Sequence, residues 1–291
     1  MSPILIEIKQ DRPGFDNFIG TWVCKGDINI IIDVGPANSV NRLIKSLIDM
    51  NLERVDFILL THIHIDHSGG LADFLEHFPM AEVICHSKGI RHLVEPSKLW
   101  AGSRTALGEI AEFYGPLKPV QKERLIPHTD AGIDGLEIIE TPGHAPHHLS
   151  FIYQGNLFVG EAGGNYSTVL EKEYLRPATP PMFFLGEFLK SIDLLLASED
   201  QPICYAHFGK AESSHRLLHR FRNQLIQWKE IIKEEMSNGQ RHIVERCVER
   251  LLEKDPDIKA FEAMEPEIRI RERFFLENSV RGYLGFLQNK E

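Results

Sequence analysis

Four side chains of metal-binding type occur within a short stretch of the chain, in the pattern His62-x-His64-x-Asp66-His67. The pattern directly follows Val55–Leu60, an apolar run typical of a buried strand, and precedes two glycines at which a helix is expected to begin. Because alternate side chains of an extended strand end point the same way, His62 and His64 can bind one cation. Asp66 and His67 lie at the turn and can supply an oxygen and a nitrogen to a neighbouring cation.

The types of these side chains narrow the choice of ion. Imidazole nitrogens mixed with a carboxylate suit Zn(II), Fe(II), Co(II) or Mn(II) better than calcium or magnesium, which usually take oxygen ligands alone. Several polar side chains beside a buried strand would be costly to desolvate unless they were paired or coordinated. Three more residues of ligand type each follow another predicted strand: His144 in Thr141–His144, Glu161 in Phe158–Glu161, and His207 in Cys204–Gly209. A metal site is therefore expected where several strand ends meet.

The whole arrangement resembles the metallo-β-lactamase superfamily, whose pattern is H-x-H-x-D-H followed by a single His, a single Asp and a final His, each after a strand. Ile32–Pro36 and Leu59–Thr61 also fit, so the resemblance extends over roughly residues 15 to 210. It implies an α/β fold, the αββα sandwich of that superfamily, with a C-terminal helical subdomain. Residues 1–209 would form the catalytic domain and residues 210–291 a helical cap that helps to bind the substrate.

The resemblance also implies two divalent metal ions, with zinc expected and iron or manganese as alternatives. The ions would be held by two sets of residues: His62, His64 and His144 for one, and Asp66, His67 and His207 for the other. The bridging carboxylate of the family falls on Glu161, where the family normally has Asp. The extra methylene moves the carboxylate outward by about 1.3–1.5 Å. Glu161 could still bridge, bind the second ion alone, or withdraw, so the number of ions stays open.

Other polar residues near these motifs are candidates for supporting roles. His148 matches a histidine that the family often carries four residues after the ligand, where it can hydrogen-bond a metal-binding group. His147 is either cleft-lining or plain surface. Arg176 belongs to a proline-rich stretch that, with Pro181–Phe184, either forms an apolar rim near the metals or packs beneath the helices. The remaining histidines, among them His86, His92, His128 and His219, have no motif support and are expected to be unspecialised.

Hydrolysis by a metal-bound hydroxide is the reaction that the resemblance implies, with Asp66 as the catalytic group that accepts a proton. The bond could belong to a thioester or other carboxylic ester, a lactone, a β-lactam or a phosphodiester. A thioester is favoured because the superfamily includes glyoxalase II and the bacterial quinolone-signal response protein, both with helices after the last metal histidine. An iron-dependent oxidoreductase and a non-catalytic metal-binding regulator remain as alternatives.

Composition limits the partners of the protein. The 291 residues include 32 Lys and Arg against 42 Asp and Glu, so the net charge of −10 disfavours nucleic acid as a partner. A small-molecule substrate is expected, and the helical tail could support a homodimer. No run approaches the length of a membrane span, and the N-terminus does not resemble a signal peptide, so a cytoplasmic protein without a membrane partner is expected. Secreted β-lactamases need a signal peptide, so the expected absence of one disfavours antibiotic hydrolysis. Four widely spaced cysteines suggest buried thiols rather than disulfides.

The elements that must position the motifs follow from hydrophobic periodicity. Strands are predicted at Ile4–Ile8, Phe18–Cys24, Ile28–Val34, Val55–Leu60, Glu82–His86, Leu136–Glu140, Leu149–Tyr153, Leu157–Val159 and Pro202–Ala206. Helices are predicted at Asn38–Met50, Gly69–Phe78, Ser87–Tyr114 and Gly186–Ala197, and from Lys210 to the end. Apolar stripes in the last region are expected to form the core of a helical subdomain.

Overall fold

Two β-sheets form the centre of the computed structural model, which describes residues 2–181 and 183–288. The first sheet has six strands in chain order, β1 (Ile4–Glu7), β2 (Gly20–Cys24), β3 (Ile30–Ile32), β4 (Phe57–Leu59), β5 (Glu82–Cys85) and β6 (Leu125–Pro127). Strands β1–β3 pair antiparallel, whereas β3–β6 run parallel. Since parallel strands end at the same edge, the segments after β4, β5 and β6 come together.

The second sheet has five strands in the order β13-β12-β9-β8-β7. Their bounds are β7 (Glu137–Glu140), β8 (Leu149–Tyr153), β9 (Asn156–Gly160), β12 (Ile203–Tyr205) and β13 (Lys210–Ala211). A separate hairpin consists of β10 (Asn165–Val169) and β11 (Lys172–Arg176). Strands β9 and β12 are parallel, so their carboxyl ends also lie side by side.

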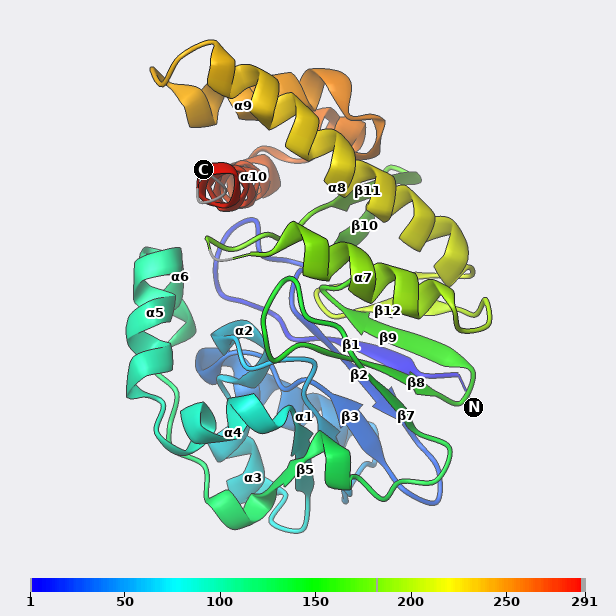
Figure 1. The fold of residues 1–291 in the computed structure, drawn as a ribbon. Coiled ribbons are helices and arrows are strands. Elements are labelled where there is room, and N and C mark those ends of the chain that lie inside the picture. The colour runs from blue at the N-terminus through cyan, green and yellow to red at the C-terminus, as the bar shows by residue number, and fades with distance from the viewer. Residues whose placement is uncertain (1, 182, 289–291) are drawn as a thin grey trace.

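Helices cover the outer faces of both sheets, as Figure 1 shows. Against the first sheet lie α1 (Val40–Asp49), α2 (Ile65–Ser68), α3 (Leu71–His77), α4 (Ser87–Val94), α5 (Ser97–Leu107) and α6 (Glu109–Tyr114). On the side of the second sheet lie α7 (Leu185–Leu196) and α8 (Ser214–Ser237), and α9 (Ile243–Lys254) and α10 (Pro266–Gln288) pack against α8. Short 3-10 helices are η1 (Ala37–Ser39), η2 (Lys122–Arg124), η3 (His128–Asp130) and η4 (Pro256–Ala263).

Three apolar clusters correspond to the three spaces between these layers. One fills the space between the first sheet and α1–α6, and a second joins the second sheet to α7–α10. The third lies between the two sheets, where the buried Trp22 donates from Nε1 to the carbonyl oxygen of Tyr205 at 2.9 Å. The layers therefore follow the order helix, sheet, sheet, helix, and the predicted αββα sandwich with helices at the C-terminal end is confirmed.

Most predicted elements are present, with a few corrections. The stretch from Lys210 begins with β13 before the helices start, and the middle region Ser87–Tyr114 divides into α4, α5 and α6. Strands β6, β10 and β11 were not predicted. The predicted apolar stripes of α8 and α9 are buried, so they form core as expected. The division at residue 209 stays a prediction.

All four cysteines are buried and unpaired, as predicted. None of the helices in the described part of the chain combines the length and apolar composition that crossing a bilayer requires.

Candidate metal centre

The His62–His67 motif lies in the turn between β4 and α2. Strand β4 ends at Leu59, so His62 and His64 lie in the segment that follows the strand, as predicted. The two rings face each other, with His62 Nε2 2.9 Å from His64 Nδ1. His144, from the turn after β7, brings its Nε2 to 3.0 Å from the same His64 nitrogen. The sequence pattern thus leads to three converging imidazoles.

The separations between these three nitrogens fit a metal ion. Tetrahedral ligands at about 2.0–2.1 Å from zinc lie about 3.3–3.4 Å apart, a few tenths of an ångström more than the distances here. Burial and the neighbouring histidines hold the pKa values of His62 and His64 well below their usual range, so both rings are neutral at pH 7 and present lone pairs. Lone pairs that face one another without a proton or a cation repel, which favours a cation between them.

A hydrogen-bond network behind the rings determines which nitrogen of each histidine is free. His144 donates from Nδ1 to the carbonyl oxygen of Ala178 at 2.8 Å, and His67 donates from Nδ1 to Asp33 Oδ2 at 2.9 Å. Thr61 donates its hydroxyl to Asp33 Oδ2, so it accepts from His62 Nδ1 at 3.0 Å. The Nε2 atoms of His62, His67 and His144 are therefore directed toward the centre, as in many metal sites.

A second group of ligand-type residues lies beside the first. Single ligand atoms of Asp66, His67 and His207 lie within 4.8 Å of one another. Asp66 Oδ2 is 3.7 Å from Nε2 of both His67 and His207. Among the residues that the structure describes, the buried His67 Nε2 has no hydrogen-bond partner. An unpartnered ring nitrogen that faces carboxylates is the arrangement that a bound cation would complete.

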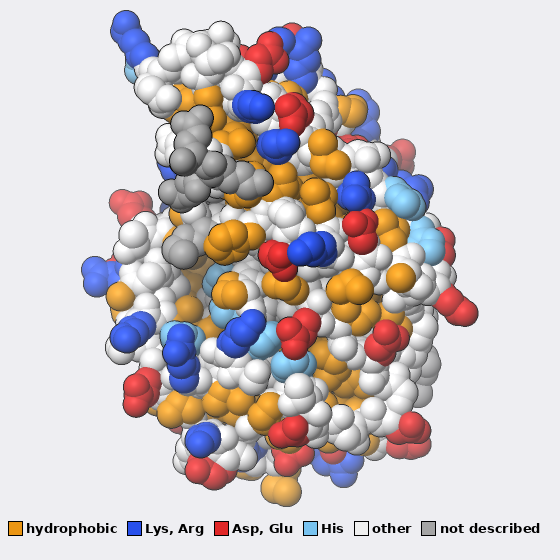
Figure 2. Space-filling view, in the orientation of Figure 1, with side chains coloured by type: hydrophobic (Ala, Val, Ile, Leu, Met, Phe, Trp, Pro, Cys, Tyr) orange, Lys and Arg blue, Asp and Glu red, His pale blue; other side chains and the backbone are white. Residues whose placement is uncertain are grey.

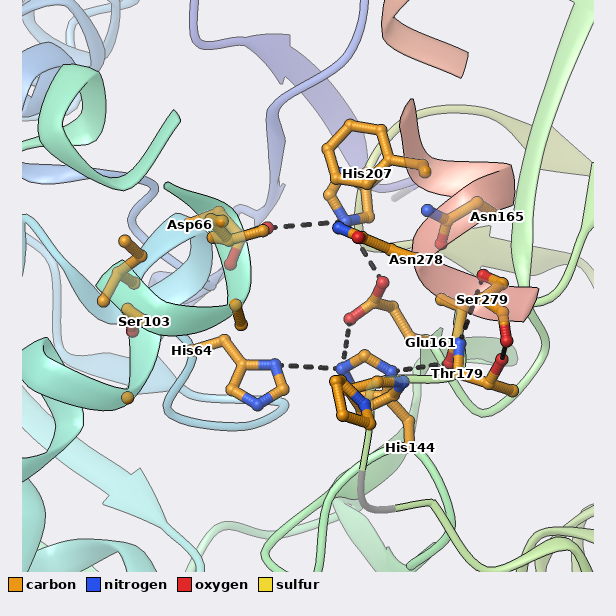
Figure 3. Close-up of a pocket in the computed structure, with 18 of the residues that line it drawn as sticks. His64, Asp66, Ser103, His144, Glu161, Asn165, Thr179, His207, Asn278 and Ser279 are labelled. Carbon is orange, nitrogen blue, oxygen red and sulfur yellow. Dashed lines mark hydrogen bonds and ion pairs between the residues drawn. The ribbon is translucent and has the colours of Figure 1, made fainter. Parts of the chain in front are cut away.

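Glu161 lies between the two groups (Figure 3). Its Oε2 is 2.8 Å from His144 Nε2 and 3.2 Å from His62 Nε2, whereas its Oε1 is 3.2 Å from His207 Nε2. Burial disfavours the charged form, but His144, His207 and His62 outweigh it and hold the pKa of Glu161 well below its usual range. The longer side chain at this position therefore still reaches both groups as a carboxylate.

The backbone around Glu161 explains how His148 contributes. His148 Nε2 accepts a hydrogen bond from the backbone N–H of Glu161 at 3.0 Å, and its ring is fully buried. A Cβ at Gly160 would lie 2.3 Å from that same nitrogen, and Gly160 has a φ of +59°. Glycine is therefore required for both reasons. His148 contacts the backbone of Glu161 and holds the start of its side chain in place.

His67 differs from the other rings because carboxylates surround it. Burial would lower its pKa, but Asp66, Asp33 and Glu161 outweigh burial and raise the pKa to about 10. The free protein thus favours a positive charge at this position. A metal ion can take the place of the proton, because metal binding and proton release are coupled.

The two groups form the floor of a cavity of about 560 Å³. Helices α5 and α10, far apart in the chain, lie on the same side of the molecule and form its walls (Figure 1). Figure 2 shows histidine side chains in and beside a hollow on this face, with Lys and Arg side chains nearby. His147 lines this cavity, which favours the cleft-lining interpretation.

One part of the proline-rich stretch lies at the rim of the cavity, and another part packs beneath the helices. Arg176 and Pro181 line the cavity, whereas Phe183 is buried against Tyr283 and Phe286 of α10. Phe184 is exposed, and Met182 lies outside the described residues. The rim is thus formed by the prolines rather than by the phenylalanines.

Two supporting residues were not predicted. Asp33 accepts hydrogen bonds from His67 and Thr61, although its segment was recognised only as part of the family resemblance. Asn165 lies at the start of β10, and with its amide in the swapped orientation it donates to Glu161 Oε1 at 3.3 Å and accepts from Arg176 at 3.2 Å. No spacing in the sequence connects Asn165 with Glu161.

Asp33→Asn is expected to weaken metal binding by about 10–100-fold without loss of the fold. Asp33 Oδ2 accepts from His67 Nδ1 and from the Thr61 hydroxyl, and Asp33 Oδ1 accepts from the Thr61 backbone N–H. An amide has a single acceptor oxygen and cannot serve both sides, so the hydrogen bond that orients the His67 ring is weakened. Zinc titration of the chelator-treated protein measures the change. Asp56→Asn, which loses an acceptor for a backbone N–H away from the centre, is the matched control. Equal zinc affinities for Asp33→Asn and the wild type would contradict this role of Asp33.

Several known proteins are similar to this chain in sequence or in fold. The family model described as "Metallo-beta-lactamase superfamily" matches residues 21–207. The chain is 28% identical over 219 residues to "Metallo-beta-lactamase fold-containing protein ST1585" of Sulfurisphaera tokodaii, covering 72% of this chain and 78% of that protein. It is 29% identical over 151 residues to "Hydroxyacylglutathione hydrolase" of Aeromonas hydrophila, covering 51% of this chain but only 48% of that relative.

Solved structures show the same architecture over nearly the whole chain. The crystal structure of ST1585 from Sulfolobus tokodaii aligns with a TM-score of 0.68 at 22% identity, covering 96% of this chain and 98% of that one. The metallo-beta-lactamase family protein TTHA1429 from Thermus thermophilus aligns with a TM-score of 0.64 at 19% identity, covering 99% of this chain and 93% of that one. At these identities the likeness concerns the fold alone.

The fold and the site together define an αββα sandwich with a candidate site for divalent metal ions at the edge where its strands end. With the family model matched over residues 21–207, the chain belongs to the metallo-beta-lactamase superfamily, most of whose members are hydrolases.

Proposed function

We propose that the protein is a two-metal hydrolase that acts on acyl thioesters or related carboxylic esters of small molecules. The observation that carries the proposal is the position of Glu161, whose two oxygens face separate groups of ligand-type residues on the floor of a large cavity. His62, His64 and His144 would hold one ion and Asp66, His67 and His207 the other, with Glu161 between them. Zinc suits this mixture of nitrogen and oxygen ligands, and iron or manganese are the alternatives.

A pair of bound ions would supply the chemistry of hydrolysis by lowering the pKa of water and polarising the scissile carbonyl. The residues of the chain would position the reactants. Asp66 combines ligand geometry with exposure to the cavity, so its second oxygen can accept a proton from the attacking water. No serine or cysteine nucleophile is required, which agrees with the burial of all four cysteines.

The walls of the cavity favour an apolar acyl group. Leu99, Ala106 and Leu107 of α5 line the cavity, and so do Phe275 of α10 and the prolines Pro180 and Pro181. Such a surface gains free energy from apolar contact at about 25 cal/mol per Å² buried. The similarity to hydroxyacylglutathione hydrolases, whose name denotes an acyl derivative of a thiol, supports a thioester as the bond.

Acyl thioesters of increasing chain length, offered with lactones and phosphodiesters, test this proposal. We expect the protein to hydrolyse the thioesters, and we expect a chelator to abolish this activity. Ala106→Trp narrows the cavity and is expected to lower kcat/KM for long acyl chains at least about tenfold, while acetyl thioester is affected less than about threefold. Thr105→Trp, on the same helix but outside the cavity, is the control. Hydrolysis of phosphodiesters alone would overturn the proposed substrate class.

A further inference from the structure

A third group of metal-binding side chains lies outside the site described above. His86 follows β5 and caps α4, His128 follows β6 and begins η3, and Glu140 ends β7. Single ligand atoms of the three lie within 4.8 Å of one another. Strand β6 is the edge of the first sheet and β7 is the edge of the second. The group therefore connects the two sheets at neighbouring edges, and none of its members belongs to the candidate metal centre.

The geometry places both imidazoles on the same carboxylate. His128 Nε2 is 3.0 Å from Glu140 Oε1 and His86 Nε2 is 3.4 Å from Glu140 Oε2. The two ring centroids are 4.6 Å apart. The imidazole side chains are 3% and 8% exposed, whereas Glu140 is 52% exposed. Two buried nitrogens thus meet a carboxylate that solvent can reach.

We propose that His86, His128 and Glu140 bind one divalent transition-metal ion of the zinc type. Two imidazoles and a carboxylate are the ligands that such ions prefer, and three protein ligands leave a position for water. The nitrogen–oxygen separations lie close to the roughly 3.3–3.4 Å that tetrahedral ligands at about 2.0–2.1 Å require. The ion would tie together the ends of three strands from both sheets. It would also fix the start of the loop from Thr141 that carries His144.

The partners of the two rings determine the strength of this site. His128 Nδ1 is buried and has no hydrogen-bond partner in the described part of the chain, so a proton can move there without breaking a hydrogen bond. His86 Nδ1 accepts from the backbone N–H of Lys88 at 3.1 Å. If His86 Nε2 binds an ion, the ring proton moves to Nδ1, which can then no longer accept this hydrogen bond. The Lys88 ammonium adds a nearby positive charge. We therefore expect weaker binding here than at the candidate metal centre.

Metal content as a function of free zinc tests the proposal on the full-length protein. The wild type, His128→Asn, Glu140→Gln and the exposed control His219→Asn are treated with chelator, dialysed against increasing Zn²⁺ and analysed for zinc per chain. At saturation, the wild type and His219→Asn are expected to bind about one ion more per chain than His128→Asn or Glu140→Gln. Equal zinc content in the wild type and both site variants at every concentration would overturn the proposal, as would an equal loss in His219→Asn.

Because the test compares the zinc content of the four proteins, its outcome does not depend on the proposed function. The ions at the candidate metal centre are common to all four proteins, so their number cancels whether or not the protein hydrolyses thioesters. Glu140 is about half exposed, so Glu140→Gln is expected to fold, and circular dichroism checks this. Co²⁺ gives a second readout: an absorption band of tetrahedral cobalt that the wild type shows and Glu140→Gln lacks supports the site, and superimposable spectra contradict it.

Discussion

Asp66→Ala is expected to lower kcat/KM for acyl thioester hydrolysis by at least about 10³-fold while leaving the fold intact. Asp66 is proposed both to hold one ion and to take a proton from the attacking water, so one substitution removes both contributions. Its side chain is 15% exposed and lies at the edge of the cavity, so its loss opens no large gap in the core. Steady-state kinetics with a thioester that the wild type hydrolyses measures the effect.

A matched control for Asp66→Ala is Asp73→Ala, which removes a partly exposed carboxylate on α3 that pairs with the exposed Lys118. This variant should retain wild-type kinetics within about twofold, because surface ion pairs contribute little. Asp66→Ala with kcat/KM within about tenfold of the wild type, and an unchanged circular dichroism spectrum, would contradict the role of Asp66. Such a result would favour a metal-binding regulator over an enzyme.

Glu272→Gln is expected to lower the free energy of unfolding by about 3–5 kcal/mol, because it leaves buried positive charges without their partner. Glu272 is 3% exposed and accepts from Arg176 Nε at 2.6 Å and from Arg271 Nε at 3.1 Å. Arg271 in turn donates to the carbonyl oxygen of Gly14. The glutamate thus joins α10 to β11 and to the N-terminal segment. Urea unfolding of both proteins at pH 7 measures the loss.

The effect of Glu272→Gln should depend on pH in a defined direction. Burial disfavours the carboxylate, but the two arginines outweigh it and lower its pKa from 4.5 to about 2. A lowered pKa in the folded protein stabilises the fold above the unfolded value and loses that contribution as pH falls from 4.5 toward about 2. The difference in unfolding free energy between wild type and variant should therefore shrink over this interval.

Glu249→Gln is the matched control for Glu272→Gln, since Glu249 is 63% exposed and pairs with Arg273 on the surface of the same region. Its effect should stay below about 1 kcal/mol. If Glu272→Gln cost no more than Glu249→Gln, the buried ion pairs would not stabilise the attachment of α10.

Much of the candidate site could be predicted because its residues lie in short local patterns. The His62–His67 motif, His144 and His207 each follow a predicted strand, and the packing of the two sheets brings these strand ends together. The position of Glu161 could be predicted, but not its reach, because the direction of its carboxylate depends on His148 and Asn165. Asp33 could not be singled out, because an aspartate after an apolar strand has many other uses.

The unpredicted elements lack local signals for physical reasons. The β10–β11 hairpin turns at Leu170 and Glu171, whose φ angles are +46° and +64°. Such turns usually contain Asn or Gly, so this sequence gives no turn signal. Strand β6 is short and ends in a proline, a residue that is poor in strand interiors. His86 and His128 looked unspecialised because only the tertiary fold brings them to Glu140.

Metal content per chain in the wild type and in Glu161→Ala tests the central claim most directly. The proteins are purified without chelator or added metal, analysed for all transition metals, and compared with Glu187→Ala, an exposed glutamate on α7. A bridging Glu161 predicts about two tightly held ions in the wild type and in Glu187→Ala, and about one in Glu161→Ala. Equal metal content in the wild type and Glu161→Ala would contradict a two-metal centre that Glu161 bridges.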